Sequence, residues 1–446
     1  MRRTSNRKNM NNLKILVPLL AALMISCNFA AADDPMQEGP SHSEMKYEDG
    51  KYRLYVNGEE FFVKGAGCEF GPCYEIAEHG GNSFRTWRTD NGRRSGKEVL
   101  DEAWEHGLMV MMGLDVARER HGFDYDDEEA VTAQLEKFRE EVKALKDHPA
   151  LLGWGIGNEL NLRYANKKVW DAVNDIARMI KEVDGNHVTT TMLAGIGPDE
   201  VAYIEENCPD IDFLSVQFYG EVVNLQQYLE EARYDGPYLI TEWGATGHWE
   251  VEQTEWGVPI EQTSTEKAQA IKDRYQNVIL ADEENCMGSY VFLWGQKQER
   301  TPSWYGMYTE AGEKTEAHNV MEYLWTGEWP EHSAPKMHEI TIEGKGDRFD
   351  DVRLEKGGEY TALVDAAHPD NKKLDIRAEI MPRPSELSDG GDYEPRPESI
   401  EGLILSANTS EIQFKAPEES GPYRILVYVT DEQNYAATAN IPFYVE

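Results

Sequence analysis

Two glutamates stand at the ends of short apolar runs that have the composition of buried strands. Glu159 closes the run LLGWGIGNE at 151–159, and Glu242 lies near the end of YLITEW at 238–243. If both runs are parallel strands of one barrel, they end on the same rim, where the functional groups of such barrels collect. Two carboxyl groups on either side of one bond are what glycoside hydrolysis requires. One attacks the anomeric carbon, and the other protonates the leaving oxygen and then deprotonates water.

The residues before Glu159 favour a constrained site over a nucleotide-binding loop. Glu159 shares one side of its strand with Gly153, Gly155 and Gly157, so the carboxyl group can lie close to neighbouring backbone and to a ligand. The run GWGIGN lacks the third glycine of a dinucleotide-binding fingerprint and leads into Asn-Glu instead of a phosphate-binding helix start. The pattern therefore favours carboxylate chemistry.

The elements that must position these glutamates alternate between apolar runs and helix-periodic segments. The amphipathic segments include 129–146, 167–182 and 265–283, and a hairpin is expected over 51–64 with its turn at Asn57-Gly58. The predicted strands are 61–66, 82–87, 108–115, 151–159, 187–193, 211–219, 238–243 and 288–294. Such a series predicts a (β/α)8 barrel over 45–330, with an open doubly wound α/β sheet as the alternative.

After Trp329-Pro330 the pattern changes to short strands separated by Gly, Pro, Asp and Asn. Strands are expected at 338–343, 360–366, 373–380, 401–406, 410–414, 423–429 and 436–445. They predict an antiparallel β-sandwich of immunoglobulin-like size over 335–446, with an exposed loop at 382–399. This region contains no Trp, which favours a spacer over a carbohydrate-binding domain.

The charge balance limits the possible partners. The chain has 44 Lys+Arg against 82 Asp+Glu, for a net charge of −38, and such a surface repels phosphate backbones. We therefore expect no nucleic-acid partner, and a strongly anionic polymer is a disfavoured substrate. With 40% hydrophobic residues the chain can bury a sizeable core, which excludes wholesale disorder.

The first 32 residues have the composition of a secretory signal. A basic start is followed by an apolar run at 15–25 that is too short to span a bilayer. The run ends Leu23-Met24-Ile25-Ser26-Cys27, which resembles a bacterial lipobox and predicts a lipidated Cys27 with a membrane tether. Ordinary cleavage after Ala30-Ala31-Ala32 is the alternative. Either reading predicts export across the inner membrane, and the lipobox favours a periplasmic, outer-membrane or cell-surface lipoprotein.

The remaining cysteines form no pattern of their own. They are Cys68, Cys73, Cys208 and Cys286, and none lies at zinc-binding spacing with histidine. Cys68 and Cys73 either form a disulfide in an oxidising compartment or remain buried thiols. The sequence predicts no metal site.

Two segments carry a resemblance to a known family. His148-Pro149 followed by GWGIGNE, and PYLITEWG at 237–244, resemble the signature segments of clan A glycoside hydrolases, the retaining (β/α)8 enzymes that include families 2 and 5. The resemblance implies that Glu159 is the acid/base and Glu242 the nucleophile. It extends over about residues 50–328 and implies a reaction without a cofactor.

Further positions match the same clan. The resemblance implies that Arg85 and Tyr219 support the nucleophile, that Asn158 bonds the sugar 2-hydroxyl, and that Trp294 forms an aromatic floor. Additional candidates for sugar contacts are Trp87, Trp243, Trp249, Trp256, His248, Asp90 and Asp115. For Trp256 and Trp249 packing is the alternative role, and for His248 a plain surface position.

The resemblance implies a retaining β-glycoside hydrolase, and the long aromatic loops favour a β-linked polysaccharide or oligosaccharide over a small aryl glycoside as its substrate. A β-glucan is the narrower expectation, with a β-1,3-glucan narrower still. A transglycosylase that uses the same site is the nearest alternative. A glycan-binding surface lipoprotein without catalytic activity is an alternative from another class.

Overall fold

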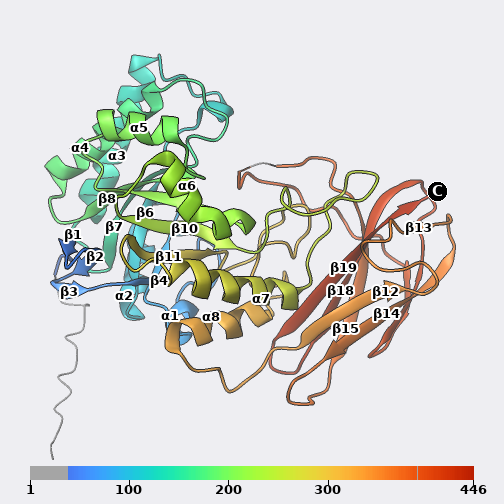
Figure 1. Cartoon of the computed structure of the whole chain (residues 1–446). Helices are drawn as coiled ribbons and strands as arrows, with labels where there is room; N and C mark the ends of the chain where they lie inside the picture. The colour runs from blue at the N-terminus through green and yellow to red at the C-terminus, as the bar shows by residue number, and fades with distance from the viewer. Residues whose placement is uncertain (1–38, 389) are drawn as a thin grey trace, which may run out of the picture. The chain divides into compact units, whose positions relative to one another are not determined.

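The computed structural model describes residues 39–388 and 390–446 (Figure 1). The predicted leader at 1–32, including Cys27, lies outside these ranges. Within them, none of the helices combines the length and the apolar composition that crossing a membrane requires.

Eight parallel strands close into a barrel, coloured from blue to yellow in Figure 1. They are β4 (Val63–Gly67), β5 (Ser83–Arg85), β6 (Met109–Leu114), β7 (Leu151–Asn158), β8 (Val188–Ala194), β9 (Phe213–Gln217), β10 (Tyr238–Gly244) and β11 (Cys286–Phe292). The predicted (β/α)8 fold is confirmed. The open sheet is wrong, because the last strand, β11, pairs with β4 and closes the ring.

Helices follow the strands and cover the outside of the barrel. They are α1 (Glu75–Glu78), α2 (Gly96–Glu105), α3 (Glu128–Leu145), α4 (Lys168–Val183), α5 (Pro198–Asn207), α6 (Leu225–Ala232), α7 (Ser264–Arg274) and α8 (Glu316–Thr326). Capping boxes begin α2, where Ser95 pairs with Glu98, and α7, where Thr263 pairs with Glu266. A continuous apolar layer between strands and helices fixes the barrel against its shell.

A small sheet covers the end of the barrel at which the strands begin. It contains β1 (Ser43–Glu48), β2 (Lys51–Val56) and β3 (Glu59–Glu60). The predicted turn at Asn57-Gly58 is present, with φ of +52° and +89° as a tight hairpin turn requires. Leu54 and Val56 pack into the apolar interior of the barrel. With this end filled, the carboxyl ends of the strands form the open rim.

The C-terminal region is a β-sandwich, coloured orange to red in Figure 1. One sheet has the order β12 (Lys336–Ile342), β14 (Glu359–Ala367), β17 (Glu411–Lys415) and β16 (Ile404–Ala407). The other has the order β13 (Arg353–Leu354), β19 (Ala436–Val445), β18 (Gly421–Thr430) and β15 (Asp375–Pro382). A separate apolar core lies between the sheets, so the predicted sandwich is confirmed.

The expectation of an exposed loop at 382–399 is wrong for part of that segment. The Glu394 carboxylate is fully buried and accepts a hydrogen bond from Arg300 at 2.6 Å. The aspartate- and glycine-rich composition indicated solvent exposure, but a buried ion pair holds the segment against the loop that follows β11.

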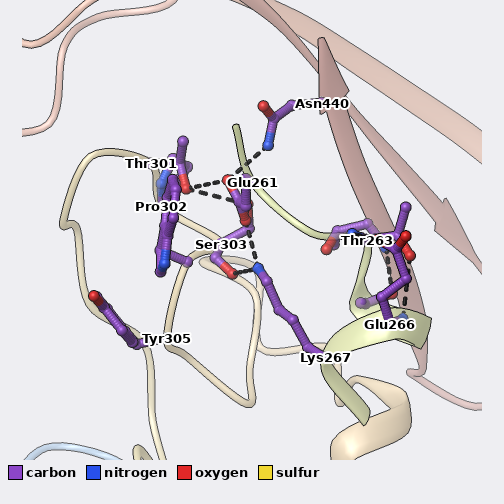
Figure 2. A network of polar contacts seen from close by, with 12 residues as sticks. Glu261, Thr263, Glu266, Lys267, Thr301, Pro302, Ser303, Tyr305 and Asn440 are labelled. Atoms are coloured by element: carbon purple, nitrogen blue, oxygen red, sulfur yellow. Dashed lines mark hydrogen bonds and ion pairs between the residues drawn. The ribbon is translucent and has the colours of Figure 1, made fainter. Parts of the chain in front are cut away.

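A second polar network joins the barrel to the sandwich (Figure 2). The buried Glu261 carboxylate pairs with Lys267 of α7 and accepts hydrogen bonds from Thr301 at 2.6 Å and Ser303 at 2.9 Å. Asn440 of β19 donates to the same carboxylate at 2.6 Å. One carboxylate thus connects α7, the loop after β11 and the sandwich, which fixes that loop in place.

Candidate active site

The ends of β7 and β10 present the two glutamates at the rim. Glu242 belongs to β10, while Glu159 follows the last residue of β7 and turns sharply with a φ of +51°. The Glu159 N–H donates to the Met192 carbonyl at 2.9 Å, and its own carbonyl accepts from Arg120 at 2.7 Å. The backbone of Glu159 is therefore fixed from both sides.

Four donors surround the Glu242 carboxylate. The Tyr219 hydroxyl donates to Oε2 at 2.8 Å, while Trp87 Nε1 and Gln217 Nε2 donate to Oε1 at 3.0 and 3.2 Å. Arg85 completes the set with an ion pair at 3.3 Å. Glu242 is only 5% exposed, so these contacts compensate for lost water and hold the group as an oriented carboxylate.

Asn158 is oriented by two of the four residues that hold Glu242. Its Oδ1 accepts hydrogen bonds from Arg85 at 2.7 Å and from Gln217 at 2.8 Å. Both bonds occupy the carbonyl end of the amide, so its NH₂ group is directed to the cavity that Asn158 lines. The side chain can therefore donate to a hydroxyl of a bound ligand.

Glu159 lies in a different environment from Glu242. Burial raises its pKa from 4.5 to about 8, and the negative charge of Glu242 adds to the rise, while Arg120, Arg85 and Arg118 oppose it. Among residues 39–388 and 390–446, none donates a hydrogen bond to its carboxyl group. Glu159 is therefore protonated at neutral pH, as a general acid must be.

A cavity of about 470 Å³ opens above Glu242 and Asn158, the residue directly before Glu159. Trp87, Asn158, Glu242 and Phe292 line it from the barrel. Residues 390–393 line it from the sandwich. The volume falls within the range of about 300–1,000 Å³ that small-molecule sites occupy.

Two of the predicted sugar-stacking residues are not available to a ligand. Trp243 is 0% exposed and packs on Tyr275 of the outer layer at 5.7 Å between ring centroids. Trp294 is among the residues that line the cavity, but it is 0% exposed and its ring stacks on Trp325 of α8 at 5.7 Å. The predicted role is wrong for both rings, because successive strand residues face opposite sides and Trp243 must face away from the side of Glu242. Trp294 lies beyond the end of β11, where alternation no longer applies.

The aromatic floor is instead built from Phe292 and Trp87. Phe292 is the last residue of β11 and meets the Trp87 ring edge to face at 5.9 Å. The Arg85 guanidinium lies over the Trp87 ring, 4.4 Å from the ring centroid. Trp87 therefore both lines the cavity and holds Glu242.

The long loop after β10 contributes one exposed ring. Trp249 is 56% exposed and meets Tyr219 edge to face at 5.4 Å, so it remains available to a ligand beside the site. His248 is buried, and its Nε2 pairs with Glu299 at 3.2 Å, so we assign it to packing and not to sugar binding. Trp256 packs on Tyr444 of β19 at 5.7 Å, which makes it an interdomain contact.

The two aspartates differ. Asp115 lines the cavity and pairs with Arg118 at 3.1 Å, whereas Asp90 is exposed and accepts from the Gly92 N–H at 2.8 Å in a turn. Asp90 therefore has no place in the cavity, while Asp115 remains a candidate contact.

Sequence reasoning missed three contributors. Gln217 donates to both Asn158 and Glu242, and its one signal was an amide near the end of an otherwise apolar strand. Phe292 has the same strand-end position, two residues before the tryptophan that drew attention. Residues 390–393 carried no signal, since nothing local to a Gly-Gly-Asp-Tyr run predicts a contact with a distant barrel.

A disulfide joins Cys68 to Cys73 and closes a short loop beyond β4 that contributes to the cavity wall. Cys208 and Cys286 are free and buried. Within the described part of the chain, no group of His, Cys, Asp and Glu side chains has the arrangement of a metal site.

Residues 90–299, just under half of the chain, match the family model described as glycosyl hydrolases family 2, TIM barrel domain. No curated protein matches the chain. The resemblance to clan A predicted from the two signature segments is thus confirmed for the barrel.

Several solved structures are similar to this chain at low identity. A β-galacturonidase from Eisenbergiella tayi is 19% identical with a TM-score of 0.47, and the match covers 64% of this chain and 54% of that one. A β-D-glucuronidase from Dictyoglomus thermophilum is 16% identical with a TM-score of 0.50, covering 64% and 53%. A family 5 mannosidase from Rhizomucor miehei is 14% identical with a TM-score of 0.44, covering 63% and 97%. The chain spans about half the length of the first two proteins.

Proposed function

We propose that this protein is a retaining β-glycoside hydrolase. One observation carries the proposal: the barrel rim holds one carboxylate fixed by four donors and, beside it, a buried carboxyl group whose pKa is raised to about 8. A nucleophile and a general acid with these opposite charge states are the two groups that double displacement uses. The family match of the barrel supports the same reaction class.

In the first step, Glu242 attacks the anomeric carbon while the bond to the leaving oxygen breaks. Glu159 transfers its proton to that oxygen, so the aglycone leaves as a neutral alcohol and a glycosyl ester forms on Glu242. Asn158 donates from its free NH₂ group to the sugar 2-hydroxyl. Tyr219 and Arg85 hold the carboxylate in the orientation for attack.

In the second step, water opens the ester. Once the ester neutralises Glu242, the charge that helped to raise the pKa of Glu159 is gone, and Glu159 has already lost its proton. It can now take a proton from water, whose oxygen attacks the same carbon from the side that the leaving group vacated. Glu242 is released as a carboxylate, and the anomeric configuration is retained.

A neutral β-linked glycan fits the cavity better than an acidic one, and a β-glucan is our specific proposal. The cavity cations Arg88 and Arg118 are paired with Glu69 at 2.6 Å and Asp115 at 3.1 Å. Lys297 is paired with Glu299. With these charges compensated, the wall offers hydrogen-bonding groups and aromatic faces instead of a site for a sugar carboxylate.

We also propose that the protein is exported and tethered through a lipidated Cys27. The disulfide between Cys68 and Cys73 supports an oxidising compartment, where such bonds persist. Palmitate labelling of the full chain in a bacterial host should mark the wild type and not Cys27→Ala. Equal labelling, or none in either, would contradict the tether.

The enzymatic proposal is tested on a panel of neutral β-glucans, β-mannans and uronic-acid glycosides. Wild-type protein should release reducing sugar from neutral β-linked substrates, and Glu242→Gln should lower turnover at least ~10⁴-fold with an unchanged circular dichroism spectrum. Glu206→Gln, on the exposed face of α5, removes the same charge away from the rim and should leave turnover intact. Full activity of Glu242→Gln, or binding of glycans without cleavage by the wild type, would refute the assignment. Products formed with excess sugar acceptor distinguish hydrolysis from transfer.

A further inference from the structure

We propose that the sandwich segment 390–394 forms one wall of the subsite that receives the leaving sugar, so that the active site is shared by both domains. The inference rests on the proposed glycosidase function and goes beyond it, since it assigns a binding role to the C-terminal region. It replaces the expectation that this region is only a spacer.

The segment lies directly beside the proposed acid. Gly390 has a φ of +57°, and a Cβ at this position would lie 3.0 Å from Glu159 Oε2 and 2.5 Å from Leu162. A side chain at this position would press on the Glu159 and Leu162 side chains, so glycine favours this close approach of the backbone to the carboxyl group. A general acid must be within hydrogen-bond reach of the leaving oxygen. Whatever borders the Glu159 carboxyl group therefore borders the leaving sugar.

One guanidinium connects the backbones of the two domains at this point. Arg120 donates through Nη1 to the Glu159 carbonyl at 2.7 Å and through Nη2 to the Gly390 carbonyl at 3.4 Å. Its neighbour His121 lines the cavity and pairs with Asp392 at 2.8 Å. The position of the sandwich segment is thus fixed relative to the carboxyl group that donates the proton.

A buried carboxylate anchors the other end of the segment to the barrel. Glu394 accepts hydrogen bonds from the Arg300 N–H at 2.7 Å, the Arg300 guanidinium at 2.6 Å and Gln298 at 3.1 Å. Its side chain is 0% exposed. A fully buried carboxylate with this many donors holds one geometry, so the wall is preformed before substrate arrives.

Tyr393 supplies the surface that a sugar would contact. Tyr393 lines the cavity together with Gly391 and Asp392, and it is 87% exposed. Its neighbour Glu394 is held in place, whereas the tyrosine ring is left open at the cavity. An aromatic face with a polar tip on a fixed backbone is suited to stacking on a sugar ring.

In the experiment, each variant of the full-length protein is assayed with two substrates. One is a β-linked oligosaccharide that occupies the leaving-sugar subsite, and the other is an aryl glycoside with a small, acidic leaving group. Tyr393→Ala should raise KM for the oligosaccharide about 3- to 10-fold and leave kcat/KM for the aryl glycoside unchanged. Tyr393→Phe, which keeps the ring, should behave as the wild type. Tyr47→Ala removes another exposed tyrosine, 64% exposed, at the opposite end of the barrel and should change the kinetics with neither substrate.

Glu394→Ala tests the anchor as a positioning residue. Release of the wall admits water to Glu159, so the alkaline limb of the pH–rate profile should move to lower pH in this variant. The shared subsite would be overturned if Tyr393→Ala affected both substrates equally or neither of them, and if the alkaline limb of Glu394→Ala did not move. The glycosidase assignment would stand in that case. A wild-type protein that cleaves no substrate would instead refute the proposed function, and this inference with it.

Discussion

Replacing Glu159 by Gln should stabilise the protein, and the gain should grow with pH. The folded protein holds a proton on Glu159 up to a pKa of about 8, whereas the unfolded chain releases it near 4.5. Between these values the folded state binds more protons than the unfolded state, so the free energy of unfolding falls as pH rises. The contribution is fully present below pH 4.5 and is lost by about pH 8. Gln cannot ionise and avoids this loss.

The magnitude follows from the two pKa values. The difference between 4.5 and about 8, at ~1.4 kcal/mol per pH unit, corresponds to about 5 kcal/mol. With an unfolding entropy of about 2.1 cal/mol/K per residue over the 446-residue chain, this equals roughly 5 °C in Tm. The assay is a series of thermal melts of both proteins from pH 4.5 to pH 9.

The Tm of Glu159→Gln should match the wild type at the acidic end and exceed it by several degrees above pH 8. Glu206→Gln removes one negative charge from an exposed position and controls for the general repulsion in this acidic protein. Its Tm difference from the wild type should not follow the same pH course. A difference for Glu159→Gln that stays flat across the series would show that Glu159 ionises normally, and the assignment of the acid would fall.

Two further predictions follow from the same structure. For substrates with a poor leaving group, kcat/KM should fall above about pH 8, because Glu159 must be protonated. A substrate whose leaving group needs no proton should lack this alkaline limb. An alkaline limb with such a substrate would contradict the role of Glu159 as the general acid. Lys267→Met leaves the buried Glu261 carboxylate without its cation and should lower the free energy of unfolding by about 3–5 kcal/mol in chemical denaturation. Adding Glu261→Gln should restore part of that loss; no recovery would mean that packing, and not charge, is responsible.

Much of the barrel could be predicted from the sequence, because each strand is a short apolar run and the apolar residues of each helix recur with helical periodicity. Glu159 and Glu242 were found for the same reason: a charged residue at the end of an apolar strand is a local signal. Gln217 was harder, since an amide in a strand is common. Its role depends on β9 lying beside β10, where Gln217 pairs with Glu242.

The aromatic residues show where a local pattern is not enough. Successive residues of β10 point to opposite faces of the sheet, so Trp243 points away from the site into which Glu242 points. For Trp294 the strand ended at Phe292, and the face that its ring would take was set by α8, to which it packs. The aromatic side chains of Trp243 and Trp294 indicated stacking on a sugar, but three-dimensional packing determined which rings face the cavity.

The C-terminal region shows a different limit, and it bears on how this site works. Its spacer role was inferred from the absence of Trp, on the premise that a domain binds sugar through its own exposed rings. Here the sandwich instead places backbone beside Glu159, and backbone contacts leave no trace in composition. The close approach of Gly390 contributes to the burial of the Glu159 carboxyl group, and burial is the main cause of its raised pKa. A barrel separated from the sandwich would therefore retain both glutamates and lose part of the environment that protonates one of them.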